Sequence, residues 1–367
     1  MNIKLGIIGL PNAGKSTLFN AITAAGAAVS NYPFCTVEPN IATVPVPDRR
    51  LEELAKIIKP EKVTPATIEF VDIAGLIKGA SKGEGLGNKF LSHIREVDAI
   101  IHVVRCFRDE NISHVYSSIE PLRDIEVVNA ELILSDLEIV EKRIEKTGRM
   151  AKSGEKKYVF EYELLKKIRD ELVKGVLLKN MELSEEEKAA ANQFFLISGK
   201  PVLYVANVDE DDIGKNISDM PAVEELHQYA SSENSDVVVV SARIEEELLQ
   251  LEPSERELFM KELGISASGM DRLIKTCYRL LGLISFITIK LPEIRAWTVK
   301  EGTRAPEAAG KIHSDFQRGF ISVDVIDYDT LISIGSFIKA KEKGLVRREG
   351  KDYIMKDGDI ALFKFNV

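Results

Sequence analysis

The chain has 367 residues, of which 45% are hydrophobic and 29% are charged, and its formal net charge is −9. This length predicts two or three domains, and the ordinary globular composition argues against disorder. The acidic balance excludes a wholly basic nucleic-acid coat protein, although it leaves room for a local basic patch.

The three cysteines, Cys35, Cys106 and Cys277, are widely spaced and form no CxxC pair. This spacing argues against a structural zinc site and against a disulfide framework, and it suits a reducing cytosol. No apolar run approaches the roughly 18 residues that a membrane helix needs. We therefore expect a cytoplasmic protein that has no membrane partner.

The first expected element is a buried strand over residues 3–8, followed by a loop that fits GxxxxGK[ST] and by a helix-like stretch at 18–25. The loop reads Gly9-Leu10-Pro11-Asn12-Ala13-Gly14-Lys15-Ser16-Thr17. Glycines in such a loop let successive N–H groups point at phosphate oxygens, and the helix amino terminus adds positive partial charge. Lys15 should reach the β and γ phosphates, and the Ser16 hydroxyl should ligate Mg²⁺. The strand–loop–helix order favours a triphosphate site over a tight turn with a surface lysine.

A second apolar strand at 67–71 is followed by Asp72 and, three residues later, by Gly75. An acidic side chain at a strand end beside a phosphate loop holds the water shell of the metal, and the Gly75 N–H can reach a γ-phosphate. Thr36 can complete the Mg²⁺ shell when the γ-phosphate is present, and the glycine-rich segment 79–87 would form a second moving loop. The expected metal ligands are Ser16, Thr36 and Asp72.

Leu76 stands where Ras-like enzymes place a glutamine that orients the attacking water. Leucine cannot orient water, so catalysis must use another group, a partner or a slow intrinsic route. The expected catalytic residues are Lys15 and His114. We take His114 as the candidate for orienting the water because another histidine, His102, lies inside the expected strand at 99–104. The alternative is that His114 is an ordinary surface or loop histidine.

The residues that read the base should follow the strand at 201–206. Guanine-selective P-loop proteins carry Asn-Lys-x-Asp there, and the aspartate accepts hydrogen bonds from N1–H and N2–H₂ of guanine. This chain has Asn207-Val208-Asp209-Glu210, which lacks the lysine and ends in glutamate. The departure argues against strong guanine selectivity and favours ATP, with adenine read by Asn207 and by backbone groups near Val208.

The next strand, at 236–240, ends in Ser241-Ala242-Arg243, which fits the loop that closes over the base; a simple strand end is the alternative. The expected nucleotide-binding residues are Asn12, Ala13, Gly14, Lys15, Ser16, Thr17, Gly75, Asn207, Val208, Glu210, Ser241 and Ala242.

Residues 128–198 interrupt the alternation of strands and helices. Apolar residues spaced three and four apart on both sides of a turn at 148–157 predict an antiparallel helical hairpin. Between Lys142 and Arg169 there are ten Lys or Arg against four Glu. We interpret this basic stretch as a contact for ribosomal RNA or an acidic partner, and an ordinary solvated helical face is the alternative.

From about residue 283 the pattern has period two, which predicts a small mixed sheet with one helix at 305–313, a β-grasp arrangement. The expected strands are 283–290, 296–300, 320–326 and 360–367. The lone Trp297 is expected to anchor the core rather than to stack on a base.

Together these motifs resemble the Obg-like ATPase (YchF) family. The resemblance is carried by residues 9–17, 31–40, 72–76, 79–88 and 207–210, and by a carboxyl-terminal segment that resembles the TGS module. It implies a P-loop protein of the translation-factor class that hydrolyses ATP in preference to GTP and associates with ribosomes. Asn12 matches the P-loop asparagine that binds K⁺ in potassium-activated relatives, so the resemblance also implies K⁺ as a cofactor beside Mg²⁺.

We therefore predict an α/β fold with a P-loop NTPase (G-protein-like) domain over 1–127 and 199–282. An inserted helical hairpin is expected over 128–198, and a β-grasp (TGS) domain over 283–367. The predicted function is Mg²⁺-dependent ATP hydrolysis by a nucleotide-dependent switch whose partners are ATP, the ribosome and ribosomal RNA, and not DNA. Two alternatives stay open, namely a GTPase of the same fold and a nucleotide-gated ribosome- or RNA-binding module in which hydrolysis is incidental.

Overall fold

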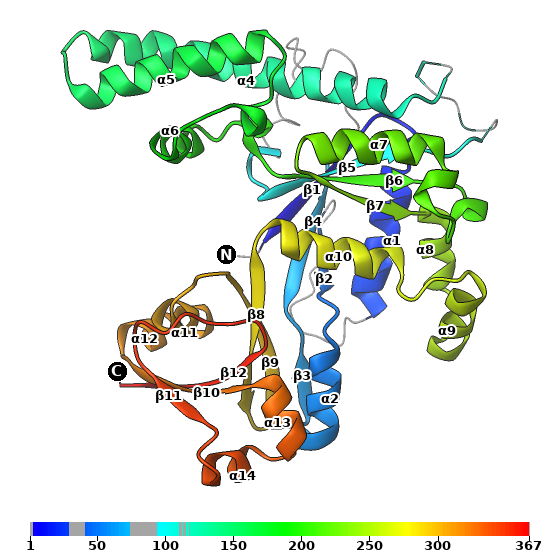
Figure 1. The fold of residues 1–367 in the computed structure, drawn as a ribbon, viewed down its shortest axis with the longest axis vertical. Helices are drawn as coiled ribbons and strands as arrows, with labels where there is room; N and C mark the ends of the chain where they lie inside the picture. The colour runs from blue at the N-terminus through cyan, green and yellow to red at the C-terminus, as the bar shows by residue number, and fades with distance from the viewer. Residues whose placement is uncertain are drawn as a thin grey trace.

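The computed structural model describes residues 3–28, 41–73, 94–109, 112, 115–116 and 118–366. Figure 1 shows a central sheet layered between helices, a long helical hairpin on one side of it, and a second sheet at the opposite end of the molecule. Among the described helices, none is both long enough and apolar enough to cross a bilayer.

The central sheet has six strands, and five of them run parallel. The order across the sheet is β2 (Ile41–Pro45), β4 (Thr67–Asp72), β1 (Lys4–Ile8), β5 (Ala99–Arg105), β6 (Val202–Asn207) and β7 (Asp236–Val240). Only β2 is antiparallel, and it lies at the edge beside β4. The parallel strands are near-continuous apolar runs because helices cover both faces of the sheet.

Two helical layers cover this sheet. Helices α1 (Lys15–Ala28) and α10 (Gly269–Leu280) pack on one face, where Leu18 and Leu273 meet Ile7 in one core. The start of α4 (Pro121–Ala151) and α7 (Pro221–Ser232) pack on the other face. Shorter helices α8 (Ala242–Leu248) and α9 (Pro253–Glu262) lie beyond β7. This arrangement leaves the carboxyl ends of the parallel strands as the place where loops converge.

The inserted hairpin is formed by α4 and α5 (Lys156–Val173), which meet at a turn over 152–155. Beyond the sheet, Val140 of α4 packs against Leu165 and Ile168 of α5 in a separate core. The base is closed by η2 (Leu178–Asn180), α6 (Glu185–Ala191), η3 (Asn192–Phe194) and η4 (Ile197–Gly199). The 31 residues of α4 correspond to about 46 Å of helix, so its far end projects well beyond the sheet.

The second sheet also has six strands. Their order is β11 (Arg347–Glu349), β10 (Phe320–Asp327), β12 (Asp359–Phe365), β8 (Leu283–Lys290), β9 (Glu293–Lys300) and β3 (Lys62–Thr64). The helices of this part are α11 (Ala305–Ile312), α12 (Ser314–Arg318), α13 (Tyr328–Ile334) and α14 (Phe337–Glu342). Helix α11 packs on the sheet, as a β-grasp requires, and its Ala308 shares a core with Phe286 of β8. Trp297 is half-buried beside this core, and its Nε1 donates a hydrogen bond to Thr288 Oγ1 at 2.9 Å.

Strand β3 belongs to this second sheet although it comes from the amino-terminal part of the chain. It pairs in parallel with β9, and helix α2 (Arg49–Ile58) precedes it. The Arg50 guanidinium donates a hydrogen bond to the Asp357 carboxylate at 2.8 Å. The predicted nucleotide-binding domain included all of residues 1–127, so it did not anticipate that β3 joins the second sheet. The backbone pairing of β3 with β9 and the ion pair between Arg50 and Asp357 connect the two sheets.

Candidate functional site: a nucleotide pocket

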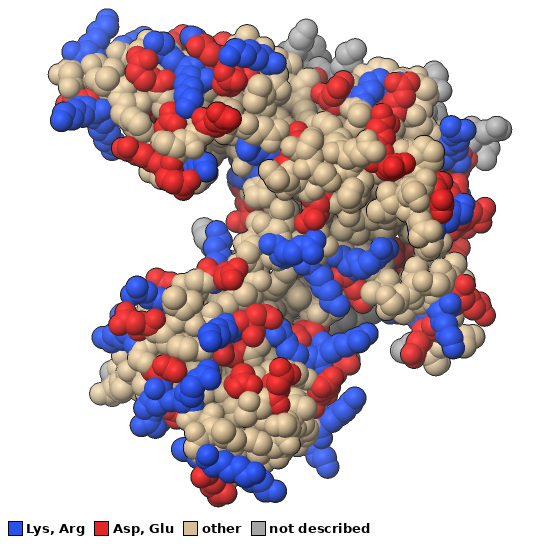
Figure 2. Space-filling model, viewed as in Figure 1, with Lys and Arg blue, Asp and Glu red and all other residues tan. Residues whose placement is uncertain are grey.

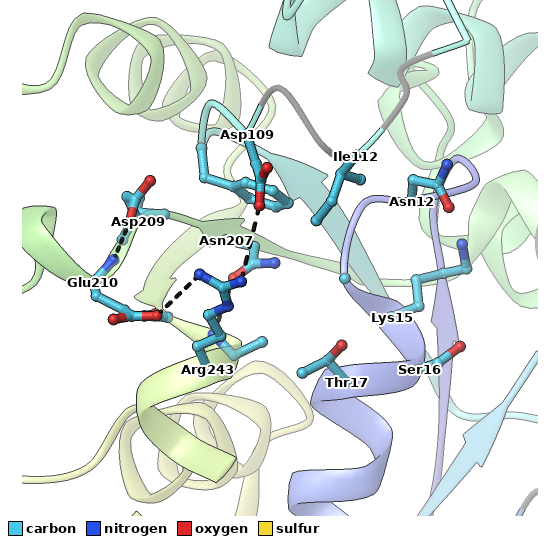
Figure 3. A pocket seen from close by; sticks show the side chains of 15 residues that line it. Asn12, Lys15, Ser16, Thr17, Asp109, Ile112, Asn207, Asp209, Glu210 and Arg243 are labelled. Carbon is cyan, nitrogen blue, oxygen red and sulfur yellow. Dashed lines mark hydrogen bonds and ion pairs between the residues drawn. The ribbon is translucent and has the colours of Figure 1, made fainter. Parts of the chain in front are cut away.

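A cavity of about 360 Å³ opens at the carboxyl ends of β1, β5, β6 and β7. Its lining comes from residues 12 and 14–17, from the connection after β5, from residues 207–210 and from residues 241–243. Figure 3 shows Lys15 and Ser16 on one side of it and Asp209, Glu210 and Arg243 on the other. Ligands bind in this kind of crevice in open parallel sheets.

The phosphate loop is held in a tight backbone curve by two glycines. Gly9 and Gly14 have φ values of 149° and 94°. A Cβ on Gly9 would lie 2.3 Å from the Val103 oxygen, and one on Gly14 would lie 2.1 Å from Asn207 Nδ2. Helix α1 begins directly after the loop, at Lys15, and has no acidic residue in its first turn. The positive end of the helix therefore faces the cavity with no acidic residue in its own first turn to neutralise it.

Lys15 is buried, with 7% of its surface exposed, and its Nζ donates a hydrogen bond to the Leu10 main-chain oxygen at 2.6 Å. Burial lowers the pKa of this amine to about 8, and the nearby Asp72 carboxylate opposes that effect. Among the residues that the structure describes, the hydrogen bond of this buried cation goes to a neutral acceptor, so it gains strongly when phosphate oxygens approach it.

Asn207 joins three of the four segments that line the cavity. Its Nδ2 donates to the Ala13 oxygen at 3.0 Å, and its Oδ1 accepts from the Ala242 N–H at 3.0 Å. The Val208 N–H donates to the Val240 oxygen at 2.9 Å. Polar groups that were expected to read the base are therefore engaged in bracing the pocket wall.

The connection after β5 forms a wall that the sequence motifs did not indicate. Phe107, Asp109 and Ile112 line the cavity from this connection. Arg105 is buried beneath it, and its Nη2 donates to the Asp109 and Ile112 oxygens at 3.2 and 3.1 Å. The position after a central parallel strand was the signal that could have identified this wall.

An ion-pair bridge formed by Asp109, Arg243 and Glu210 lies across the cavity from Lys15. Arg243 Nη1 lies 3.3 Å from Glu210 Oε1, and Nη2 lies 3.9 Å from Asp109 Oδ2. Figure 3 shows Arg243 between the two acids. The three side chains come from the connection after β5, from the segment after β6 and from the first turn of α8.

The described residues include oxygen donors suited to Mg²⁺. Ser16 is exposed and lines the cavity at the start of α1, and Asp72 ends β4. Burial raises the pKa of Asp72, an effect that the Lys15 charge opposes, so the two side chains lie close enough to interact electrostatically. No group of three or more His, Cys, Asp or Glu is placed to hold a metal among the residues that the structure describes. A hydroxyl and a carboxylate that share an ion with phosphate oxygens fit Mg²⁺, which prefers such hard ligands.

Most of the predicted site residues lie around one cavity. Those that line it are Asn12, Gly14, Lys15, Ser16, Thr17, Asn207, Val208, Glu210, Ser241 and Ala242. Ala13 and Asp72 are not part of the lining, although Ala13 accepts the hydrogen bond from Asn207. The predictions for Thr36, Gly75, Leu76 and His114 fall outside the described residues. The sequence motifs did not indicate Arg105, Phe107, Asp109 and Ile112. Asp209 and Arg243 lie within predicted segments, but the sequence assigned them no role.

Two family models match the chain. One, described as 50S ribosome-binding GTPase, matches residues 4–135, and the other, described as a protein of unknown function (DUF933), matches residues 283–366. The chain is 52% identical to the protein named ribosome-binding ATPase YchF from Bacillus subtilis, over 100% of both chains. It is 49% identical to the protein of that name from Escherichia coli O157:H7, again over 100% of both chains.

A solved structure agrees with these matches. The structure of the Schizosaccharomyces pombe YchF GTPase aligns with a TM-score of 0.88 at 36% identity, covering 99% of this chain and 98% of that chain. The similarity therefore extends over both sheets and the hairpin, beyond the nucleotide pocket.

Proposed function

The chain belongs to the YchF family, whose curated members are named ribosome-binding ATPases, and from this premise we propose that its pocket hydrolyses ATP in preference to GTP. The hydrolysis would depend on Mg²⁺. The protein would act as a nucleotide-dependent switch that binds the ribosome in the cytoplasm. The observation that supports a triphosphate site most strongly is the buried Lys15 amine at the end of a tightly curved loop that opens on the 360 Å³ cavity.

In this proposal the triphosphate lies along the loop. Lys15 exchanges its hydrogen bond to the Leu10 oxygen for the β- and γ-phosphate oxygens, and the first N–H groups of α1 donate to the same charge. Ser16 and Asp72 would hold Mg²⁺, which when bound neutralises negative charge on the phosphates. The γ-phosphoryl group passes to water, and these fixed donors stabilise the charge that develops in the transition state.

The preference for adenine is supported by the residues that follow β6. Val208 stands in place of the lysine that guanine-selective proteins carry, and Glu210 stands in place of their aspartate. Asn12 lines the pocket with a φ of 62°, and it is the residue through which K⁺ would be bound. A higher turnover in KCl than in NaCl is the expected sign of that ion.

The test is phosphate release from ATP and from GTP by the full chain and by two lysine variants. Lys15→Ala should lower ATP turnover by about 100-fold or more, because it removes a fixed charge from the transition state. The control is Lys56→Ala, which alters an exposed lysine on α2 and should leave turnover unchanged. Equal or faster turnover of GTP would favour the GTPase alternative, and an unaffected Lys15→Ala variant would contradict a triphosphate site.

We further propose that the free end of the hairpin contacts ribosomal RNA. Lys152, Lys156 and Lys157 are exposed there, and they make no ion pair with any residue that the structure describes. Figure 2 shows Lys and Arg side chains standing out at this end. Val159 and Phe160 are also exposed nearby, at 40% and 36%. Unpaired cations beside exposed apolar groups suit a phosphate backbone and unstacked bases.

Charge reversal tests this contact. The variant Lys152→Glu/Lys156→Glu/Lys157→Glu should lose most of its cosedimentation with ribosomes and should show a shallower dependence on salt. The matched control reverses Lys142, Lys166 and Lys174, which already pair with Glu138, Glu163 and Glu171 on the same hairpin. Loss of binding only in the control would contradict the proposed contact. A variant that lacks turnover yet binds ribosomes and supports growth normally would favour the module in which hydrolysis is incidental.

A further inference from the structure

Glu210 occupies the sequence position at which guanine-selective proteins place the aspartate that reads the base. A glutamate carries the same two acceptor oxygens on one more methylene, so the change of residue alone does not remove the ability to accept from guanine. Glu210 lines the cavity, and 39% of its side chain is exposed. Something besides the residue type must therefore decide whether this carboxylate is available to a base.

In the structure one oxygen of that carboxylate is already paired. Arg243 Nη1 lies 3.3 Å from Glu210 Oε1, and Asp109 Oδ2 lies 3.9 Å from Nη2 on the other side of the guanidinium. The buried Arg105 side chain holds the segment that carries Asp109 in place by donating hydrogen bonds to the main-chain oxygens of Asp109 and Ile112. Arg243 is thus held between two acids that both line the cavity (Figure 3).

The hydrogen-bonding pattern of this arrangement discriminates between the two bases. A guanidinium carries only donors, and a carboxylate that it has paired offers fewer free acceptor positions. Guanine presents donors at N1 and N2 and would need the Glu210 oxygens. Adenine presents an acceptor at N1 and would tolerate the guanidinium nearby. An unmatched donor in a pocket of this kind is costly to affinity.

We propose that Arg243 is a specificity-determining residue, which rejects guanine by withholding the Glu210 carboxylate from it. The inference rests on the proposed function of the cavity as a nucleotide site, and it names the group that sets the base preference there. It assigns to the first turn of α8 a role that neither the Asn207–Glu210 motif nor the phosphate loop can supply.

The test measures the affinity of the full chain for ADP, GDP and IDP by titration calorimetry. Arg243→Met keeps the aliphatic stem and removes the donors, and it should raise the affinity for GDP about tenfold, the effect of one hydrogen bond to a charged group. IDP has the N1–H of guanine but no N2 amine, so it should gain less than GDP. ADP should gain nothing. The double variant Arg243→Met/Glu210→Gln should return GDP to its original affinity, because the freed carboxylate is gone.

The control is Arg279→Met, which alters an exposed arginine that pairs with Asp236 away from the cavity and should change none of the three affinities. Arg243 is 65% exposed, so its replacement should leave the folded state intact, as a thermal melt would verify. An unchanged ratio of ADP to GDP affinity in Arg243→Met, or a gain in GDP affinity that survives Glu210→Gln, would overturn the proposal.

These outcomes are separable from failure of the proposed function. If the unaltered chain binds ADP in a manner that depends on Lys15 while the Arg243→Met ratio stays constant, only the role of Arg243 is wrong. If the unaltered chain binds none of the three nucleotides, the cavity is not a nucleotide site and both proposals fail.

Discussion

Asn207 Nδ2 donates a hydrogen bond to the Ala13 main-chain oxygen at 3.0 Å, so the end of β6 fixes the phosphate loop in place. The Oδ1 of the same side chain accepts from the Ala242 N–H, and Asn207 is 5% exposed. One buried amide therefore sets the spacing between the loop at 9–17 and the segment at 241–243. The side chain that the sequence predicts to read adenine therefore also builds the walls of the pocket.

Replacing this amide should weaken the binding of every nucleotide together. Asn207→Ala would leave the Ala13 oxygen and the Ala242 N–H unsatisfied in a buried place, which should cost about 2–3 kcal/mol of unfolding free energy. Urea unfolding measures that loss, and titration with ADP and GDP should show both affinities falling with little change in their ratio. The control, Asn216→Ala, alters an exposed asparagine. A fall confined to ADP would indicate direct reading of adenine by Asn207 instead.

A side chain at Gly14 should clash with its surroundings, and Gly154 allows the effect of that clash to be separated from the effect of backbone strain. A Cβ at Gly14 would lie 2.1 Å from Asn207 Nδ2, and its φ is 94°. Gly154 has a similar φ of 79°, but a Cβ there would have no neighbour within 4 Å. Gly14→Ala should abolish measurable nucleotide binding, whereas Gly154→Ala should cost only about 1 kcal/mol of unfolding free energy from backbone strain. Equal effects of the two variants on binding would show that the clash is relieved by side-chain movement.

Nucleotide binding should take up a proton near pH 8. The pKa of Lys15 is lowered to about 8 by burial, so about half of these amines are neutral at that pH, and triphosphate oxygens would raise the pKa again. Below about pH 7 the amine is already protonated, so the uptake should vanish. Calorimetry with a non-hydrolysable ATP analogue, in two buffers of different ionisation enthalpy, measures the uptake at pH 8.0 and at pH 6.5.

Lys15→Arg provides the control for this proton uptake, because an arginine stays charged throughout the range. That variant should bind the analogue without taking up a proton at either pH. Uptake that persists in Lys15→Arg would assign the proton to another group.

The hairpin should depend on one buried carboxylate at its base. Asp136 on α4 is 0% exposed, and its oxygens accept from the Ile197 and Ser198 N–H groups at 2.9 and 2.7 Å. Asp136→Asn keeps one acceptor and introduces an NH₂ opposite a donor, so it should lower the unfolding free energy by about 2–3 kcal/mol. Compared with the unaltered chain, the variant should show a larger increase in amide hydrogen exchange at residues 196–199 than in β6. The control is Asp170→Asn, an exposed position on α5, which should change little. Uniform loss of protection across both sheets would contradict a local anchor.

Much of the fold could be predicted because its signals are local. The predicted strands at 67–71, 236–240 and 283–290 differ by no more than one residue from β4, β7 and β8, since each is an apolar or alternating run bounded by turns. The α/β fold, with its P-loop domain and second sheet, is confirmed. The phosphate loop was visible because its chemistry depends on consecutive residues.

The sequence by itself indicated many of the strands and helices, predicted where a phosphate would be held and showed which base motif is altered, because each of these depends on neighbours along the chain. Only the tertiary structure decided that β3 pairs with β9, that Asn207 braces Ala13 across 194 positions, and that Arg243 pairs with Glu210. Contacts of this kind join residues that no period or motif links. They are selected by how helices and strands pack, so they emerge only when burial and pairing are satisfied over the whole chain.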